Sequence, residues 1–506
     1  MGGQPSKTSS PAWEKKAVEE ALRDMDRTYD EKKGGRPVED RKAEKLPLDV
    51  VATRPEQILK DPKNRRVKEG SFSQPLSSTN PQQVLSSPAA RVADQQVFNI
   101  RIPSEGAPIT NQRSSGRCWL FASTNVFRIA IMAKYQLDKF ELSQAYLFYW
   151  DKLEKANWFL EQALATTDEP LDGRLMQTLL GDPISDGGQW DMVHNLVDKY
   201  GLVPQSLYPD SWNAQSSGTL NAVLKNKLRE STLRLRRMAR VEGASADELS
   251  AEKDRMVAEV QQSLTLLLGP PPSPTEAFRW QYQDRHGRGH ELRMRPREFA
   301  RDLGGGGGEV RISSSTIDSM ISLVDDPRHE PLTLLTVSRL GNVVGGRPVR
   351  YINVPMSTMK SACVQMLRAG LPVFFGCDVG KFGDRAAGIL DTGLVDYALG
   401  GLASDGLLGM SKAQRLRTGE SQMTHAMVLT AVHVDDDTGR PTRWRVQNSW
   451  GKDSGSEGWY VMSDEWMDAF VFQAVVDLRF CSGEVRKVLD KEPVVLPPWD
   501  PMGSLA

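Results

Sequence analysis

The sequence predicts an α+β protein in which a helical half is followed by a sheet-rich half. From Cys118 to about residue 134, apolar side chains recur at helical spacing and leave one apolar face. A second helix is expected near 142–160. Beyond residue 350, short apolar runs alternate with polar turns, a pattern typical of buried strands. These runs are residues 371–377, 426–433, 442–448 and 458–462.

Shifts in composition divide the chain into successive segments. We expect a mobile N-terminal extension (1–54), an arm and helical half (55–204), an inserted helix-rich region (205–345), a sheet-rich half (346–482) and a C-terminal arm (483–506). The extension is rich in Lys, Glu, Ser and Pro, which favours mobility. Within the insertion, residues 221–268 are helix-rich, the prolines at 270–272 end that run, and residues 279–282 indicate a strand. The glycine run at 304–308 indicates a flexible loop.

Composition excludes several classes of protein. The 64 Lys and Arg residues are balanced by 65 Asp and Glu, so the overall charge says nothing about binding to nucleic acid or membranes. Four cysteines in 506 residues form no disulfide scaffold, and no pair has metal-ligand spacing. We therefore expect no metal and no cofactor. The chain shows no secretory segment and no apolar stretch long enough to span a bilayer, so we expect a cytoplasmic protein.

A reactive cysteine is predicted at Cys118. Gly116 permits a sharp turn just before it, and the predicted helix begins at the cysteine itself. The positive end of the helix dipole and the unpaired amides there favour the thiolate, which is the nucleophilic form. Gln112 lies six residues earlier. Its side-chain amide is suited to stabilise an oxyanion together with the backbone N–H of Cys118.

A base and an orienting group are predicted downstream. His425 precedes an apolar run typical of a buried strand, and Asn448 ends a second such segment. Asn448 can accept the imidazole N–H, and Trp450 can shield that bond from water. Taken singly, Cys118 is typical of a small core residue, His425 of a structural histidine, Asn448 of a turn and Gln112 of a surface amide. Together, in this chain order, they favour nucleophilic catalysis.

The local motifs around these residues resemble those of papain-like cysteine peptidases. The cysteine segment reads Ser-Gly-Arg-Cys-Trp, and the later segments read His-Ala and Gln-Asn-Ser-Trp-Gly. The chain is most similar to the bleomycin hydrolase and bacterial aminopeptidase C group. That similarity extends through residues 141–157, 186–190, 326–329, 374–382 and 499–506. It implies the papain-like fold, with Cys118 as nucleophile, His425 as general base, Asn448 as orienter and Gln112 as oxyanion donor.

The resemblance also implies how substrate is bound. Gly187 and Gly188 correspond to a stretch whose backbone pairs with extended substrate, where a missing side chain permits close approach; a plain turn is the alternative. The C-terminal arm is expected to enter the cleft and to place the carboxylate of Ala506 against the substrate's α-ammonium. The implied activity is that of an aminopeptidase acting through a thioester on peptides and related small amides with a free α-amine. A disordered tail is the alternative for the arm.

The chain departs from the wider papain pattern in two ways. Secreted relatives often carry a disulfide-bonded cysteine pair at positions that here are Ser115 and Ser185, and the loss of both fits a reducing compartment. In papain-type signatures the histidine follows the cysteine by about 130–150 residues. Here Cys118 and His425 are 307 residues apart, which predicts the large insertion between them.

A basic stretch in the insertion leaves a second function open. Its members are Lys225, Lys227, Arg229, Arg234, Arg236, Arg237 and Arg240. The interpretation without a binding role is a solvent-exposed helix face. The resemblance implies a homohexamer with an inner channel, and the stretch would then contribute phosphate contacts for weak, sequence-independent nucleic-acid binding. The alternative hypothesis is thus a nucleic-acid-binding assembly in which peptidase activity is secondary.

The first residues fit a lipidation pattern. Met1 to Ser6 matches N-myristoylation, with Gly2 as acceptor. A tail that begins Met-Gly by chance is the alternative. One myristoyl chain binds membranes only marginally, so reversible membrane association is the most it gives.

Overall fold

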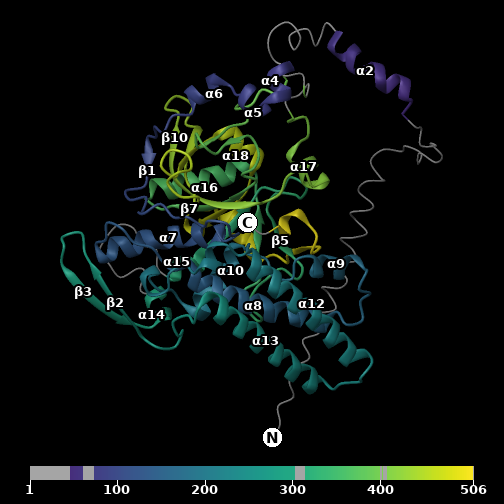
Figure 1. Ribbon diagram of the computed structural model, residues 1–506. Helices are drawn as coiled ribbons and strands as arrows, with labels where there is room; N and C mark the ends of the chain where they lie inside the picture. The colour runs from purple at the N-terminus through teal and green to yellow at the C-terminus, as the bar shows by residue number, and fades with distance from the viewer. Residues whose placement is uncertain (1–45, 61–72, 302–313, 399–401, 403–406, 505–506) are drawn as a thin grey trace.

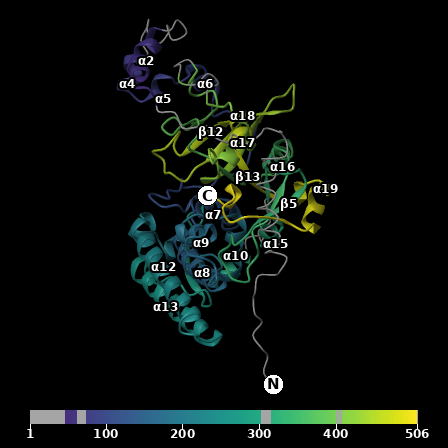
Figure 2. The same ribbon diagram turned by 90° about the vertical axis from the view of Figure 1, so that its right-hand side faces the viewer.

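The computed structural model describes residues 46–60, 73–301, 314–398, 402 and 407–504. Gly2, Ala506 and the glycine run at 304–308 lie outside the described residues, as does most of the extension. In the described part, the longest helices lie in the lower half of the molecule, and most strands lie in the upper half together with several shorter helices (Figure 1, Figure 2).

The helical half is built around α7 (Cys118–Tyr135). Every residue of this helix from Cys118 to Met132 is buried, which is typical of a central helix packed on all sides. It packs against α8 (Gln144–Ala165) and α10 (Trp190–Tyr200), with α9 (Arg174–Gly181) between these two in the chain. Both helices predicted near 118–134 and 142–160 are thereby confirmed.

The inserted region adds a helix pair and a hairpin. Helices α12 (Gly218–Arg240) and α13 (Ala246–Leu268) pack on each other and on α8. A capping box between Ser245 and Glu248 starts α13, which ends just before the prolines. Strands β2 (Phe278–Gln283) and β3 (Gly289–Met294) then pair as the hairpin that projects from the body in Figure 1. The predicted helices and strand of this region are confirmed.

One large sheet forms the other half. Its strand order is β14-β5-β6-β4-β13-β7-β10-β11-β12-β9-β8, with β1 also paired to β10. The bounds are β1 Ile100–Arg101, β4 Met320–Val324, β5 Thr333–Val337, β6 Tyr351–Asn353, β7 Val373–Cys377, β8 Gly383–Asp384, β9 Ile389–Leu390, β10 His425–Val434, β11 Pro441–Gln447, β12 Trp459–Ser463, β13 Val471–Asp477 and β14 Val494–Leu496. The four predicted strands correspond to β7, β10, β11 and β12.

The sheet begins earlier in the chain than predicted. Strands β4 and β5 lie within residues 205–345, the range assigned to the insertion, yet β4 pairs with β13 and β5 pairs with β6 and β14. The sheet-rich half therefore starts at residue 320, not 346. Of the two strands paired with β4, β13 lies about 150 residues further along the chain, a pairing that local sequence patterns do not reveal.

Shorter helices surround this framework. They are α2 (Leu48–Lys60), α4 (Ser73–Ser78), α5 (Pro81–Val84), α6 (Pro88–Ala93), α11 (Trp212–Gln215), α14 (Pro296–Arg301), α15 (Ser314–Ser319), α16 (Met356–Arg368), α17 (Lys412–Thr418), α18 (Asp464–Phe470) and α19 (Gly483–Lys487), with 3-10 turns η2 (Gln205–Leu207), η4 (Leu478–Phe480), η5 (Val488–Asp490) and η6 (Pro501–Gly503). None of the described helices has the length and apolar composition needed to cross a membrane.

A single apolar core joins the two halves. It runs without interruption from the helices around α7 to strands β4, β7, β10 and β13. A second, smaller core lies under the N-terminal arm and contains Leu85, Ile389, Leu394, Val395 and Val461. Because α7 packs directly against β10 and β7, the first residue of α7 and the first residue of β10 are brought together.

Candidate active site

Strand pairing places His425 next to Asn448. His425 is the first residue of β10, and Asn448 follows directly after β11. The two strands are antiparallel, with Val428 opposite Gln447, so the start of one and the end of the other meet at the same edge. The imidazole Nε2 of His425 lies 2.9 Å from Oδ1 of Asn448. This is the hydrogen bond that the sequence predicts.

Cys118 lies at the start of α7, beside the histidine strand. Arg117, which precedes the helix, supplies no side-chain cap, and the amides of Leu120 and Phe121 donate to its carbonyl, so the amides of Cys118 and Trp119 are the ones that face the sulfur. Burial raises the pKa of the Cys118 thiol to about 11, although the backbone amides of Ala426, Trp119 and Cys118 itself each lower it. The amide of Ala426, directly after His425, thus lies close to the sulfur. The thiol is only 2% exposed.

His425 is buried as deeply as the thiol. It is 3% exposed, and burial lowers the pKa of its imidazole to about 4, partly opposed by the hydrogen bond to Asn448. Neither the thiol nor the imidazole is therefore stable as an isolated charge in this closed site. Transfer of the thiol proton to the ring would create two opposite charges that stabilise each other.

Trp450 covers the imidazole. Its ring centre lies 4.8 Å from that of His425, with 31° between the ring planes. The neighbouring backbone amide of Ser449 donates to the same Asn448 oxygen at 2.8 Å, which fixes the amide's orientation. The ring of Trp450 and the nearly complete burial of Asn448 shield the His425–Asn448 bond from water, as predicted.

The side-chain amide of Gln112 has one possible orientation. Its Oε1 accepts a hydrogen bond from the Ser449 hydroxyl at 2.6 Å, and its Nε2 donates to the carbonyl of Ser115 at 2.7 Å. The backbone amide of Gln112 also donates to the carbonyl of Ser449, at 2.8 Å. Since a primary amide has two N–H groups, one remains to donate to a substrate oxygen. Gln112 therefore connects the nucleophile loop to the residue after Asn448.

A buried carboxylate supports the nucleophile loop. Asp186 accepts from the backbone amide of Gly116 at 3.0 Å and pairs with Nζ of Lys152 at 2.7 Å. Ser217 and Asn221, at the start of α12, donate to the same carboxylate. Burial alone would raise the pKa of Asp186, but Lys152 and these hydrogen bonds hold it well below its usual range. The insertion therefore contacts the loop that carries Cys118.

Sequence reasoning missed the side chains that hold this loop. Lys155 donates from Nζ to the carbonyl of Gly187 at 2.6 Å, and Lys152 donates to that of Ser185 at 2.9 Å. Arg117 is completely buried and forms two 2.8 Å bonds with Asp210. The available signal was the presence of charged residues inside an otherwise apolar helical segment, where burial requires a partner.

The glycines of the loop have a packing role. A β-carbon on Gly188 would lie 2.6 Å from ring atoms of Trp119, whose indole N–H donates to the carbonyl of Asp186 at 2.6 Å. The Gly187 carbonyl already accepts from Lys155. The ring of Trp119, the residue after the nucleophile, therefore leaves no room for a side chain at position 188. The predicted pairing of Gly187 and Gly188 with substrate stays a prediction.

The C-terminal arm crosses beside the site. The carbonyl of Ser504 accepts from Nε2 of Gln189 at 2.7 Å, and its hydroxyl donates to the carbonyl of Met423 at 2.6 Å. Gln189 follows Gly188, and Met423 lies two residues before His425. The arm thus connects the helical half to the sheet-rich half next to the segments that carry His425 and Cys118.

Comparison with known proteins identifies the family. The model of the Peptidase C1-like family matches residues 48–503. The chain belongs to this family. Membership of the Peptidase C1-like family confirms the predicted class of enzyme, a cysteine-type hydrolase.

Individual relatives agree with this assignment. The C1-like chain is 43% identical to human bleomycin hydrolase over 418 residues, which is 81% of this chain and 89% of the relative. It is 42% identical to the mitochondrial cysteine proteinase 1 of Saccharomyces cerevisiae (strain JAY291), over 82% and 84% of the two chains. The crystal structure of PepW from Lactobacillus rhamnosis superposes with a TM-score of 0.84 at 37% identity, covering 91% of this chain and 99% of that one. The predicted papain-like α+β fold is confirmed.

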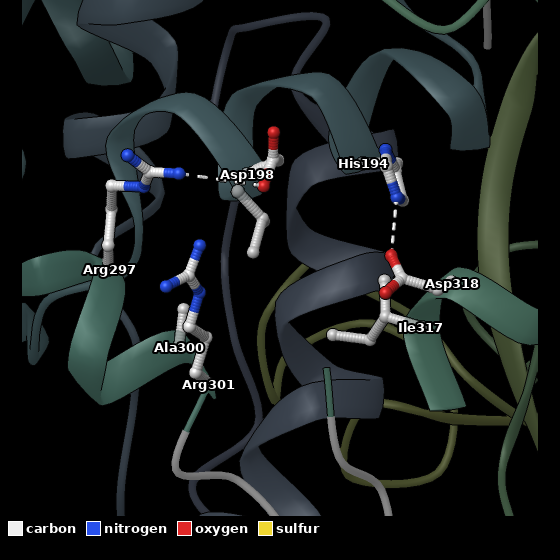
Figure 3. Close-up of a pocket in the computed structure, with 8 residues that line it drawn as sticks. His194, Asp198, Arg297, Ala300, Arg301, Ile317 and Asp318 are labelled. Carbon is white, nitrogen blue, oxygen red and sulfur yellow. Dashed lines mark hydrogen bonds and ion pairs between the residues drawn. The ribbon is translucent and has the colours of Figure 1, made fainter. Parts of the chain in front are cut away.

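A second pocket is lined by none of the candidate catalytic residues. It is formed by α10, α14 and α15, and Figure 3 shows its lining. Nε2 of His194 lies 2.7 Å from Asp318, and Arg297 pairs with Asp198 at 3.8 Å. None of the residues that line it is among the predicted catalytic residues.

The basic stretch of α12 is occupied by contacts within the chain. Lys225, Lys227, Arg234 and Arg237 form ion pairs with Asp182, Glu259, Glu242 and Glu242, respectively. Arg229, Arg236 and Arg240 donate to backbone carbonyls. Each cationic group of the stretch therefore has an intramolecular partner, which gives the predicted nucleic-acid contacts no support.

Replacing Gly188 tests the packing of the loop. We expect Gly188→Ala to lower the free energy of unfolding by about 1–3 kcal/mol, because its β-carbon overlaps the Trp119 ring. Urea denaturation measures this. Gly218→Ala is the matched control, since a β-carbon there meets nothing within 4 Å. Equal stability of the two variants would contradict the packing role.

Replacing His425 tests how the thiol loses its proton. In His425→Ala the thiol can deprotonate only to solvent, so alkylation of Cys118 by iodoacetamide should keep rising with pH toward a pKa of about 11. In the wild type, transfer to the imidazole should make the thiolate available at much lower pH. Mass spectrometry of the Cys118 peptide measures the rates. His433→Ala, at the other end of β10, is the control; identical profiles for all three proteins would exclude proton transfer to His425.

Proposed function

We propose that the protein is a cysteine aminopeptidase in which Cys118 attacks the carbonyl carbon of the first peptide bond. The observation that carries the proposal is the 2.9 Å bond between His425 and Asn448, with the sulfur of Cys118 held beside the amide that follows His425. This arrangement provides a nucleophile, a base and a group that orients the base. Family membership and the relatives described above support the same activity.

The proposed reaction proceeds in two steps. The Cys118 proton passes to His425 as the sulfur bonds to the carbonyl carbon, and the oxygen that becomes negative accepts from Gln112 and from the Cys118 backbone N–H. The imidazolium then protonates the leaving amine, the C–N bond breaks and a thioester remains. Water attacks the thioester while His425 takes its proton. Collapse releases the acid and returns the proton to the sulfur.

Specificity for the amino terminus is attributed to the C-terminal arm. At Ser504 the arm contacts Gln189 on one side and Met423 on the other, so it occupies the space next to the loop at 186–188. A peptide extended beyond one residue on the acyl side would have to displace it. We therefore infer substrates with a free α-amine, namely peptides and related small amides. A homo-oligomer and a cytoplasmic location stay predictions.

A buried ionic cluster anchors the arm. Arg328 donates to Asp500 at 2.7 and 3.1 Å and to Asp326 at 2.7 and 2.9 Å. The Asp500 carboxylate also accepts from the backbone amide of Met502 at 2.8 Å, which starts the final turn. On the helical side, the guanidinium of Arg174 lies 4.3 Å from the ring centre of Trp499. These contacts fix the arm before substrate binds.

The catalytic assignment is tested with two variants. Cys118→Ala should abolish hydrolysis of an aminoacyl coumarylamide. Gln112→Ala should lower kcat by about 10²-fold, since one oxyanion donor is lost. Iodoacetamide alkylation of Cys118 forms no oxyanion, so its rate should be retained in Gln112→Ala. A parallel fall in alkylation would show that Gln112 only positions the loop, and residual hydrolysis by Cys118→Ala would overturn the proposed function.

The role of the arm is tested at its anchor. Asp500→Asn weakens the pairing with Arg328, so the arm should detach more often and admit longer peptides. We expect kcat/KM for an N-acetylated peptide to rise relative to that for the same peptide with a free amine. Asp490→Asn, an exposed change in the same C-terminal region, is the control. An unchanged ratio in Asp500→Asn would remove the arm from the specificity mechanism.

A further inference from the structure

An exposed arginine lies at the edge of the candidate active site. Arg385 is exposed, in the turn between β8 and β9, and its guanidinium carbon is 4.7 Å from the ring centre of Trp450. Trp450 is itself 4.8 Å from the His425 ring. Imidazole, indole and guanidinium therefore follow one another outward from the buried base to the surface.

The position of Arg385 is fixed by its backbone. Its carbonyl accepts from the amide of Gly455 at 2.9 Å and from the hydroxyl of Tyr460 at 3.2 Å. The adjacent Asp384 is engaged by Arg91, at 2.6 Å, and does not pair with Arg385. Within the described ranges, the Arg385 guanidinium forms no ion pair and no hydrogen bond, so its N–H groups are available to a ligand.

The chemistry of the proposed reaction identifies which part of the substrate passes Arg385. His425 protonates the leaving amine, so the leaving residue must lie on the imidazole side of the scissile bond. The acyl residue lies on the other side, toward the loop at 186–188 and the arm. Trp450 and Arg385 extend the imidazole side outward, and the next group that a leaving residue presents there is its side chain or its α-carboxyl.

We propose that Arg385 binds the α-carboxylate of the leaving residue, as a dipeptide presents it. This inference rests on the proposed function. A guanidinium that lies over an indole keeps its N–H edge free, and that edge suits a carboxylate, which accepts two parallel hydrogen bonds. The stacking also reduces the side-chain entropy lost on binding.

A bound carboxylate would also assist the base. The positive charge of Arg385 is one of the groups that lower the pKa of His425, after burial itself. A carboxylate on Arg385 neutralises this charge, so the imidazolium that forms during attack is less disfavoured. The effect belongs to the formation of the thioester, because the leaving residue departs with it. Hydrolysis of the thioester should not depend on the leaving residue.

The test compares dipeptides that differ only at the leaving carboxyl. With full-length protein, kcat/KM is measured for Ala-Ala and for Ala-Ala amide. The wild type should prefer the free carboxylate, and Arg385→Gln should lower that preference by about tenfold, the factor expected for one charged hydrogen-bonding contact. Arg385→Lys should keep part of it. Arg385→Glu should shift preference toward Ala-Lys amide, whose leaving side chain is cationic.

The control is Arg443→Gln, since Arg443 also lies over an aromatic ring, 6.0 Å from the centre of Phe98, but contacts none of the proposed catalytic residues. It should keep the wild-type ratio. A wild type without preference, or an unchanged ratio in Arg385→Gln, would overturn the carboxylate site while Cys118→Ala still abolishes turnover of both dipeptides. Turnover by Cys118→Ala would instead overturn the proposed function on which the site rests.

Discussion

The antiparallel pairing of β10 with β11 is the constraint on which the site depends. It places the first residue of one strand beside the residue that follows the other, and it does so through backbone hydrogen bonds that are independent of the catalytic side chains. A register shift of one residue would turn His425 to the opposite face of the sheet. The common core behind β10 and β7 then holds α7, and with it Cys118, against the same edge.

Charge is distributed unequally around this edge. Around the site, buried ionisable groups are paired with opposite charges and hydrogen-bonded, as Lys152 is with Asp186 and Arg117 with Asp210. The reacting thiol and imidazole, in contrast, are shifted toward their neutral forms. Permanent buried charges keep the loops in place because removing one partner is costly. In the proposed reaction the thiol and the imidazole become charged together, as the proton passes from one to the other.

Sequence reasoning predicted those parts of the molecule that local pattern determines. The helix at Cys118, the strands at His425 and before Asn448, and the bond between these two side chains all follow from periodicity and short motifs. It did not predict that residues 320–337 join the main sheet, because that pairing is made with distant strands. It also missed Lys152, Lys155 and Arg328, since a buried charge is recognisable only when its partner's position is known. For Gly188, the structure adds a cause, the Trp119 ring, that no spacing reveals.

The burial of Cys118 affects how fast its thiol is oxidised when no substrate is bound. Peroxides oxidise thiolates far faster than thiols, and they need access to the sulfur. Cys118 is only 2% exposed, which restricts that access, and burial raises the pKa of its thiol. The other three cysteines are buried as well. Burial of the nucleophile therefore slows its irreversible oxidation by limiting the access of peroxides to the sulfur.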